Sequence, residues 1–131
     1  MYRVLTALFL LVATTVASSA QGLLPAIWQS QRGAILKVLW ADAATGNFGG
    51  VFISAPGGPC PGVPNNVTGR KWGPRVNFVT TRTWTLDCRV TARWSGRLTG
   101  PTTMVARWTA VFVDANGRRV VRSGSEFFRR I

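Results

Sequence analysis

The amino-acid sequence predicts an all-β protein that folds as an eight-stranded antiparallel up-and-down β-barrel. Three observations support this prediction: the candidate elements are short, they are filled with β-branched and aromatic residues, and no segment keeps a helical period. Closure into a barrel removes the exposed strand edges that an open sheet would have to protect. An immunoglobulin-like sandwich is the alternative architecture. An eight-stranded barrel has room inside for one small ligand.

The first three strands are expected over residues 25–30, 34–40 and 47–55. The first of these carries a tryptophan and is followed by a Gln-Arg-Gly turn. The second is apolar and β-branched, and a polar turn ends it. The third contains two phenylalanines and the pair Gly49–Gly50, which we interpret as the site of a β-bulge.

A loop separates these strands from the next two. Residues 56–64 hold four prolines and three glycines in nine positions, a composition that does not continue a strand. Strands are then expected over residues 67–71 and 75–84. Near the end of the chain, Asn116–Gly117 predicts a tight turn, and the eighth strand is expected over residues 122–130.

The hairpin with arms 89–98 and 102–110 supplies the sixth and seventh strands and has the clearest alternation in the chain. Side chains of a strand point to alternate faces, so Trp94 and Trp108 share an apolar face. A Thr-Gly-Pro turn joins the arms. The opposite face carries Arg89, Arg93, Arg97 and Arg107. We therefore expect the two tryptophans in the barrel lumen and the arginines in solvent.

Residues 1–20 differ in character from the rest of the chain. Arg3 precedes an apolar run over residues 4–12, and small residues follow up to Ala20. This pattern is typical of a secretory signal peptide, and the run is too short for the alternative, a transmembrane anchor. We expect a secreted protein, extracellular or periplasmic, with one domain over residues 21–131 and no transmembrane segment after cleavage.

This location determines the oxidation state that we expect for the two cysteines. Cys60 and Cys88 would both meet an oxidising compartment, where one disulfide is the expected state. In the chain-entropy model such a bridge stabilises the fold by roughly 3–4 kcal/mol. Two free thiols are the alternative if the chain is not exported.

The charge balance limits the function classes. Lys and Arg number 16 against 4 Asp and Glu, there is no His, and the formal net charge is +12. Loss of residues 1–20 would remove only Arg3 from this count. Such a chain attracts nucleic acid and anionic surfaces without specificity. Sequence-tolerant binding of single strands needs aromatic and basic residues on one exposed face, whereas the hairpin separates them.

Catalytic and metal-binding patterns are absent from the sequence. Without His, no serine has a plausible general base, and no carboxylate pair has catalytic spacing. No residues have the spacing of metal ligands. The chain is therefore predicted not to be an enzyme, and no cofactor or metal is expected.

An ordered set of short motifs resembles the avidin and streptavidin family and covers nearly all of the mature chain. No single motif is specific, whereas the ordered set is more so. The set consists of Trp28 with Gly33–Ala34, then residues 45–54, 67–69, 94–96, 103–108 and 124–128. The placement of Cys60 and Cys88 is similar to that in disulfide-bearing dimeric avidins such as rhizavidin. This resemblance implies a secreted barrel that holds biotin at its open end.

The resemblance also implies the residues around the ureido group of biotin, which offers one acceptor oxygen and two N–H donors. The family positions that donate to the oxygen fall on Ser30, Ala34 and Phe52, and the last two cannot donate a hydrogen bond. The positions that accept from the two N–H groups fall on Ser54 and Glu126, which remain competent. An ion pair between Glu126 and an arginine is the alternative role for this carboxylate.

The family's aromatic walls fall on Trp94, Trp108 and either Trp84 or Arg82, depending on how the loop before Cys88 is aligned. Simple core filling is the alternative role for the two hairpin tryptophans. The family positions that serve the carboxylate end of the ligand fall on Val90 and Ala92, which cannot form hydrogen bonds. The candidate ligand-binding residues are Ser30, Phe52, Ser54, Trp84, Trp94, Trp108 and Glu126.

We therefore expect a secreted avidin-like binder of biotin or a biotin-like molecule, with affinity weakened by the lost hydrogen bonds. A homodimer or homo-oligomer is expected, and the family's intersubunit tryptophan has no clear counterpart, which disfavours the streptavidin-type tetramer. The alternative function is a divergent cationic barrel that kept the fold, lost biotin binding and acts through protein or polyanion contacts.

Overall fold

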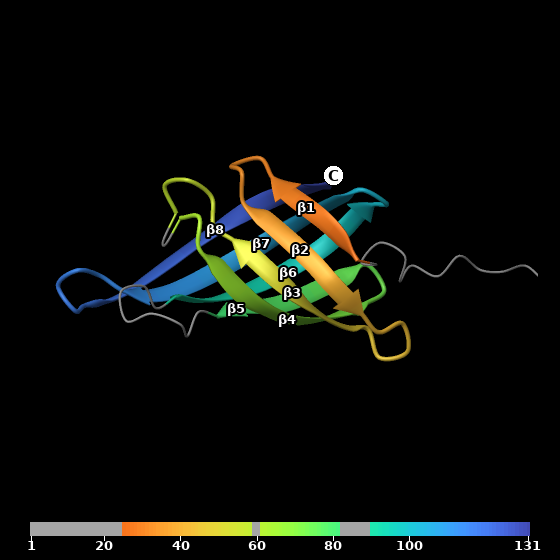
Figure 1. Ribbon diagram of the computed structural model, residues 1–131, viewed down its shortest axis with the longest axis horizontal. Coiled ribbons are helices and arrows are strands. Elements are labelled where there is room, and N and C mark those ends of the chain that lie inside the picture. The colour runs from red at the N-terminus through yellow and green to blue at the C-terminus, as the bar shows by residue number, and fades with distance from the viewer. Residues whose placement is uncertain (1–24, 59–60, 82–89) are drawn as a thin grey trace, which may run out of the picture.

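The computed structural model describes residues 25–58, 61–81 and 90–131. Over these residues, eight antiparallel strands close into one barrel in the order β1 to β8, which confirms the predicted fold class (Figure 1). The sandwich alternative is excluded because β1 pairs with β8. The described part of the chain contains no helix long and apolar enough to cross a membrane. The strands are β1 (Ala26–Ser30), β2 (Ile35–Ala41), β3 (Asn47–Ile53), β4 (Pro64–Trp72), β5 (Arg75–Thr81), β6 (Val90–Gly100), β7 (Thr103–Val113) and β8 (Arg119–Arg130).

Contacts between the first and last strands close the barrel. Ser30 lies opposite Phe128 in the β1–β8 ladder. The side-chain Oε1 of Gln31 accepts a hydrogen bond of 2.7 Å from the backbone N–H of Phe127. This bond joins residues 96 positions apart, so it fixes the β1–β2 turn against β8. The turn belongs to the end of the barrel that we call the mouth, together with the β3–β4 connection and the β7–β8 hairpin.

Lumen-facing residues form rows that run from strand to strand. The first row is Phe78, Trp94, Trp108 and Gly124, which lie opposite one another on β5, β6, β7 and β8. The second row, one step nearer to the mouth, is Thr80, Ala92, Ala110 and Arg122. The side chains of Arg93, Arg97 and Arg107 are exposed on the outer surface. The expected separation of tryptophans and arginines on opposite faces of the hairpin is therefore confirmed for these residues, and Arg89 lies outside the described residues.

Several strand boundaries differ from those that the sequence predicts. β4 begins at Pro64 rather than at residue 67, because proline is tolerated at the first position of a strand. β7 continues to Val113 and β8 begins at Arg119, three residues earlier than expected. The resulting β7–β8 hairpin extends beyond the neighbouring strands (Figure 1). The turn between β6 and β7 is formed by residues 101–102 rather than by Thr-Gly-Pro.

The β-bulge lies in β2, not at the glycine pair that the sequence suggested. The register between β2 and β3 shifts between Val38 and Trp40, so Leu39 is an extra residue of β2. The glycines of β3 lie opposite this bulge. A Cβ atom at Gly50 would overlap the backbone carbonyl oxygen of Lys37, so glycine is required for the close approach of the two strands.

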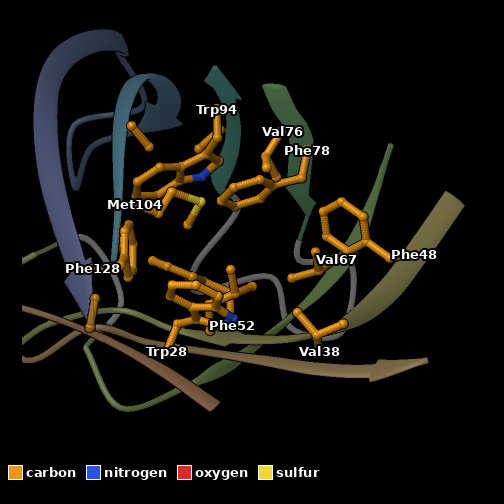
Figure 2. Packing of buried hydrophobic residues seen from close by; sticks show 14 of the residues in the cluster. Trp28, Val38, Phe48, Phe52, Val67, Val76, Phe78, Trp94, Met104 and Phe128 are labelled. Carbon is orange, nitrogen blue, oxygen red and sulfur yellow. The ribbon is translucent and has the colours of Figure 1, made fainter. Parts of the chain in front are cut away.

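A hydrophobic core fills the lumen on the side away from the mouth (Figure 2). Trp94 is central to it, because its ring is nearly parallel to that of Phe78, with ring centroids 5.3 Å apart. The same ring lies 5.0 Å from the centroid of Phe52 and 5.9 Å from that of Phe128. The largest fully buried side chains are Trp28, Phe48, Phe128, Leu36, Met104 and Val76. This packing leaves the mouth side of Trp94 as the place for a ligand.

One charged side chain is buried in β4. Lys71 is only 8% exposed, and it follows Val67 and Gly69 on the lumen face of the strand. Burial lowers the pKa of the Lys71 ammonium below its ordinary value of 10.5, because the charged form is poorly solvated. Lys71 therefore costs stability at neutral pH, where it is charged in both the folded and the unfolded chain.

We expect Lys71→Met to raise the free energy of unfolding at pH 7 by about 1 kcal/mol. The stability of the unmodified protein should rise with pH between the lowered folded pKa and 10.5, because the unfolded chain binds more protons there. This rise should be absent from Lys71→Met. Urea denaturation at pH 7 and pH 10 measures both effects, with Lys37→Met on the outer face as the control. Lower stability of Lys71→Met at pH 7 would contradict the expectation.

Candidate ligand-binding site

A cavity of about 260 Å³ opens at the mouth of the barrel. The β1–β2 turn contributes Arg32, the β3–β4 connection contributes Ser54, and β8 contributes Arg122 and Glu126. The volume lies slightly below the usual range for small-molecule sites, which begins at about 300 Å³. The cavity is therefore suited to one small ligand.

Aromatic side chains form the inner wall of the cavity. Trp94, Trp108 and Phe52 all line it. The ring centroids of Trp94 and Trp108 are 6.1 Å apart, and the planes are tilted by 42°. The Nε1 atom of Trp94 donates a hydrogen bond of 3.3 Å to the hydroxyl of Thr80, which holds the indole in place. A flat ligand can therefore contact two indole rings and one phenyl ring at once.

Gly124 determines how Trp108 lies. A Cβ atom at Gly124 would be 2.6 Å from Cζ2 of the Trp108 indole, closer than real Cβ contacts. The ring therefore packs directly on the backbone of β8, which only glycine permits. Since Gly124 and Trp108 are directly opposite in the β7–β8 ladder, this packing places the indole along the cavity wall.

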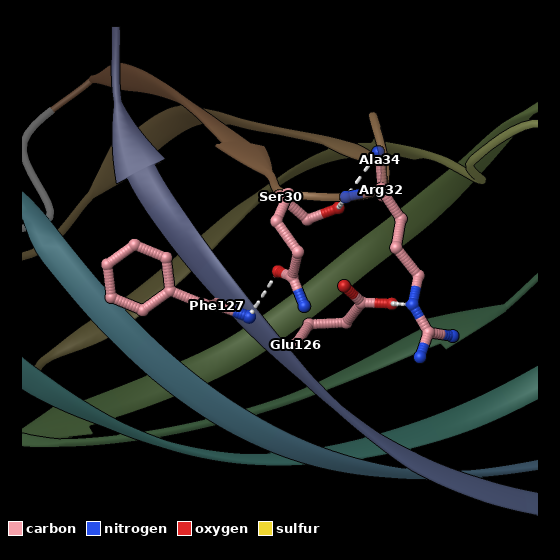
Figure 3. A network of polar contacts seen from close by, with 6 residues as sticks. Ser30, Arg32, Ala34, Glu126 and Phe127 are labelled. Carbon is pink, nitrogen blue, oxygen red and sulfur yellow. Dashed lines mark hydrogen bonds and ion pairs between the residues drawn. The ribbon is translucent and has the colours of Figure 1, made fainter.

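A buried carboxylate lies beside the β1–β2 turn. Glu126 is 7% exposed and lines the cavity from β8. Its Oε1 lies 3.9 Å from Nε of Arg32, whose side chain is 63% exposed and reaches down from the turn (Figure 3). The distance is at the limit of an ion pair, and it leaves Oε2 without a hydrogen-bond partner among the described residues. The expected alternative role of Glu126 in an ion pair is thus present, but it occupies one oxygen only.

Two further residues that line the cavity carry unpaired polar atoms. The amide nitrogen of Asn65 donates to the carbonyl oxygens of Val63 at 3.3 Å and Phe52 at 3.5 Å. This orientation leaves Asn65 Oδ1 buried and without a partner in the part of the chain that the structure describes. The Nε1 atom of Trp108 is also buried and has no hydrogen-bond partner among the described residues. Buried polar groups of proteins are nearly always hydrogen-bonded, so the unpaired oxygens of Asn65 and Glu126 are available to a ligand in the cavity that both residues line.

The structure places the other residues predicted for the site as follows. Ser54 and Ala34 line the cavity. Ser30 is buried, and its hydroxyl oxygen accepts hydrogen bonds from the backbone N–H groups of Ala34 at 3.0 Å and Arg32 at 3.3 Å (Figure 3). This hydroxyl therefore holds the β1–β2 turn, and the residues that line the cavity do not include Ser30. Trp84, Arg82, Cys60 and Cys88 lie outside the described residues.

Four residues of the site escaped the sequence analysis. Asn65 and Thr80 carry a detectable signal, because each lies two positions from an apolar lumen residue of its strand. The expected boundaries leave Asn65 between a loop and a strand, and Thr80 lies inside the strand expected over residues 75–84. The same rule applies to Arg122, which lies two positions from Gly124 on the strand face of Glu126. Arg32 gave no signal, because its position depends on how the β1–β2 turn meets the mouth.

The chemistry of the site is that of recognition. Within residues 25–58, 61–81 and 90–131, no group of His, Cys, Asp and Glu side chains could hold a metal ion. Glu126 and Asn65 offer hydrogen-bond acceptors, and the Trp108 indole offers a donor. Aromatic walls with a few convergent polar atoms are typical of small-molecule binding sites.

Comparison with known proteins agrees with this geometry. No protein-family model and no curated protein matches the sequence. Among solved structures, the bradavidin2–biotin complex is 29% identical, with a TM-score of 0.71 over 82% of this chain and 97% of that one. The rhizavidin–biotin complex is 23% identical, with a TM-score of 0.68 over 81% and 91% of the two chains. Intact afifavidin without ligand is 22% identical, with a TM-score of 0.70 over 86% and 88%.

The likenesses to rhizavidin and afifavidin show a shared fold, and that to bradavidin2 adds a higher sequence identity. All three neighbours are avidins, and the structures of bradavidin2 and rhizavidin are complexes with biotin. The resemblance that the ordered motifs indicate is confirmed, and the chain is an avidin-like eight-stranded β-barrel.

Proposed function

We propose that the protein binds biotin or a biotin-like small molecule in the mouth of the barrel, with lower affinity than the tight-binding members of the avidin family. The observation that carries this proposal is a cavity with aromatic walls that is lined by two residues with unpaired buried oxygens, Oε2 of Glu126 and Oδ1 of Asn65. A cyclic urea offers two N–H donors, which complement the two unpaired acceptor atoms of Glu126 and Asn65. The biotin complexes among the structural neighbours support the same ligand class.

The lower affinity follows from the residues that cannot donate a hydrogen bond to the ureido oxygen. Ala34 and Phe52 line the cavity where the family resemblance places two such donors. Each buried hydrogen bond that is left unmade costs roughly 1–3 kcal/mol. Two of them correspond to several decades in the dissociation constant. We therefore expect micromolar rather than sub-nanomolar binding of biotin.

Isothermal titration calorimetry of the purified protein with biotin tests the proposal. One site per chain with a micromolar dissociation constant is expected. A sub-nanomolar dissociation constant would show that the lost donors are replaced by other groups. The complete absence of heat at high micromolar biotin, with no protection of tryptophan fluorescence from quenching, would overturn biotin as the ligand.

Two further expectations are part of this proposal. The signal-peptide pattern supports export of the chain, and N-terminal sequencing of the protein from the culture medium or periplasm should show cleavage after Ala20. The avidin-like fold supports a homodimer or homo-oligomer. Light scattering combined with size-exclusion chromatography measures the oligomeric state.

A second candidate function rests on the outer surface. Trp72, Arg75, Arg97 and Arg107 line a shallow groove outside the barrel, and Arg75 lies directly opposite Arg97 in the β5–β6 ladder. Like charges in direct opposition are destabilising, which favours an anionic partner at this place. A polyanion complex of defined stoichiometry that survives biotin saturation would support this candidate. Salt-sensitive retention on heparin alone would not, because any strongly basic protein shows it.

A further inference from the structure

The outer surface of strands β4 to β7 concentrates positive charge around a groove. Two adjoining hollows in this surface share Asn77, Ser95 and Arg107 in their walls, so they form one groove. The short side chains of Asn77 and Ser95 lie opposite each other in the β5–β6 ladder and form its floor. We call this region the arginine groove, because its walls contain five exposed arginines: Arg70, Arg75, Arg93, Arg97 and Arg107.

The register of the strands brings these arginines close together. Arg75 lies directly opposite Arg97. Arg107 is a diagonal neighbour of both Arg93 and Arg97, because it lies opposite the residue between them. Strands β4 to β7 contain no Asp or Glu, and no ion pair among the described residues involves an arginine of the groove. The groove therefore carries a positive charge that no described carboxylate balances.

An aromatic side chain lies on the same face as these charges. The tryptophans of the β6–β7 hairpin face the lumen, which separates them from the arginines of that hairpin. The neighbouring strand β4 supplies the missing aromatic residue, because Trp72 lies directly opposite Arg75 and lines the groove. Its indole is 43% exposed. The outer surface as a whole thus combines basic and aromatic side chains on one exposed face, as binding of single strands requires.

We propose that the arginine groove binds single-stranded nucleic acid, with phosphates on the arginines and a base stacked on the Trp72 indole. This inference rests on the second candidate function, and it names the polyanion. The side chains of Asn77 and Ser95 on the floor can form hydrogen bonds with sugar and phosphate oxygens. Every base has a flat face for stacking, so the groove should accept any sequence. A sulfated polysaccharide would meet the same charges but offers no planar base to the exposed indole.

Fluorescence anisotropy with a labelled oligothymidylate and with an abasic strand of the same length tests the stacking. The protein should bind the oligothymidylate about 10-fold more tightly than the abasic strand. Trp72→Ala should bind the two strands alike, with its affinity for the abasic strand unchanged. Trp40→Ala is the matched control and should keep the preference, because it removes an indole that is 51% exposed and lies outside the groove.

The salt dependence of the same titrations tests the contacts with phosphate. A plot of the logarithm of the binding constant against the logarithm of the salt concentration should become less steep in Arg97→Gln, by about 0.7. Arg119→Gln, at an exposed position outside the groove, should leave the slope unchanged. Saturation with biotin should alter neither the affinity nor the slope, because the ligand cavity opens into the lumen and not onto this surface.

Three results would count against the inference. Equal affinities of the unmodified protein for the two strands would overturn nucleic acid as the partner and leave a polyanion site in place. An equal loss of affinity for both strands in Trp72→Ala would also overturn it, since the indole would then act on the shape of the groove. The absence of a saturable complex with either strand and with a heparin oligosaccharide would overturn the second candidate function together with this inference, and it would leave biotin binding intact.

Discussion

Replacement of Trp94 by alanine is expected to lower the free energy of unfolding by about 3–5 kcal/mol, the usual cost of removing a large aromatic side chain from a core. The indole contacts Phe52, Phe78 and Phe128, and a cavity would form between rings that come from three other strands. The residue also forms the inner wall of the ligand cavity, so binding at the mouth should be lost as well.

Urea denaturation followed by circular dichroism measures this effect. Trp72→Ala removes an indole that is 43% exposed on the outer surface, and it should cost much less stability. Trp94→Phe retains an aromatic ring and should lie between the two. A loss of less than about 1 kcal/mol in Trp94→Ala would mean that the lumen collapses around the missing ring, contrary to the tight packing described above.

The double substitution Ala34→Ser with Phe52→Tyr is expected to tighten biotin binding by about 100-fold. Both residues line the cavity, and both hydroxyls would return donors where the family resemblance places them. A net contribution of about 1–1.5 kcal/mol for each hydrogen bond gives this factor. Each single variant should provide roughly half of the gain in free energy.

Calorimetry with biotin checks this gain. Ala41→Ser adds a hydroxyl at the opposite end of β2, away from the cavity, and should leave the affinity unchanged. If the double variant binds no better than the unmodified protein, the ureido oxygen does not face these two positions. The ligand would then lie in a different orientation from the one that the resemblance implies.

The faces of the strands could be predicted from the sequence, because alternation along a strand is a local property. Trp94 and Trp108 face the lumen as the hairpin pattern predicts, and the same rule applied to β4 and β5 would have found Asn65 and Thr80. These two were missed because a polar residue in a strand is normally taken as solvent-facing. A barrel with a polar cavity breaks that expectation at its mouth.

The relations between distant segments could not be predicted. The contact between Arg32 and Glu126 depends on the closure of β1 onto β8, which the sequence indicates only through the total number of strands. The sequence did not reveal that β4 starts at Pro64, because this proline continues the proline- and glycine-rich loop that precedes the strand. The bulge at Leu39 was assigned to the wrong strand, since the glycines that accommodate it lie opposite.

The fluorescence of Trp94 and Trp108 should report on the occupancy of the cavity. Indole rings with centroids 6.1 Å apart are close enough for their electronic transitions to couple, and both rings border the space that a ligand would occupy. A bound molecule would displace water from both rings and change their emission together. Ligand binding and competition among unlabelled compounds can therefore be followed by intrinsic fluorescence, without a dye or a tag on either partner.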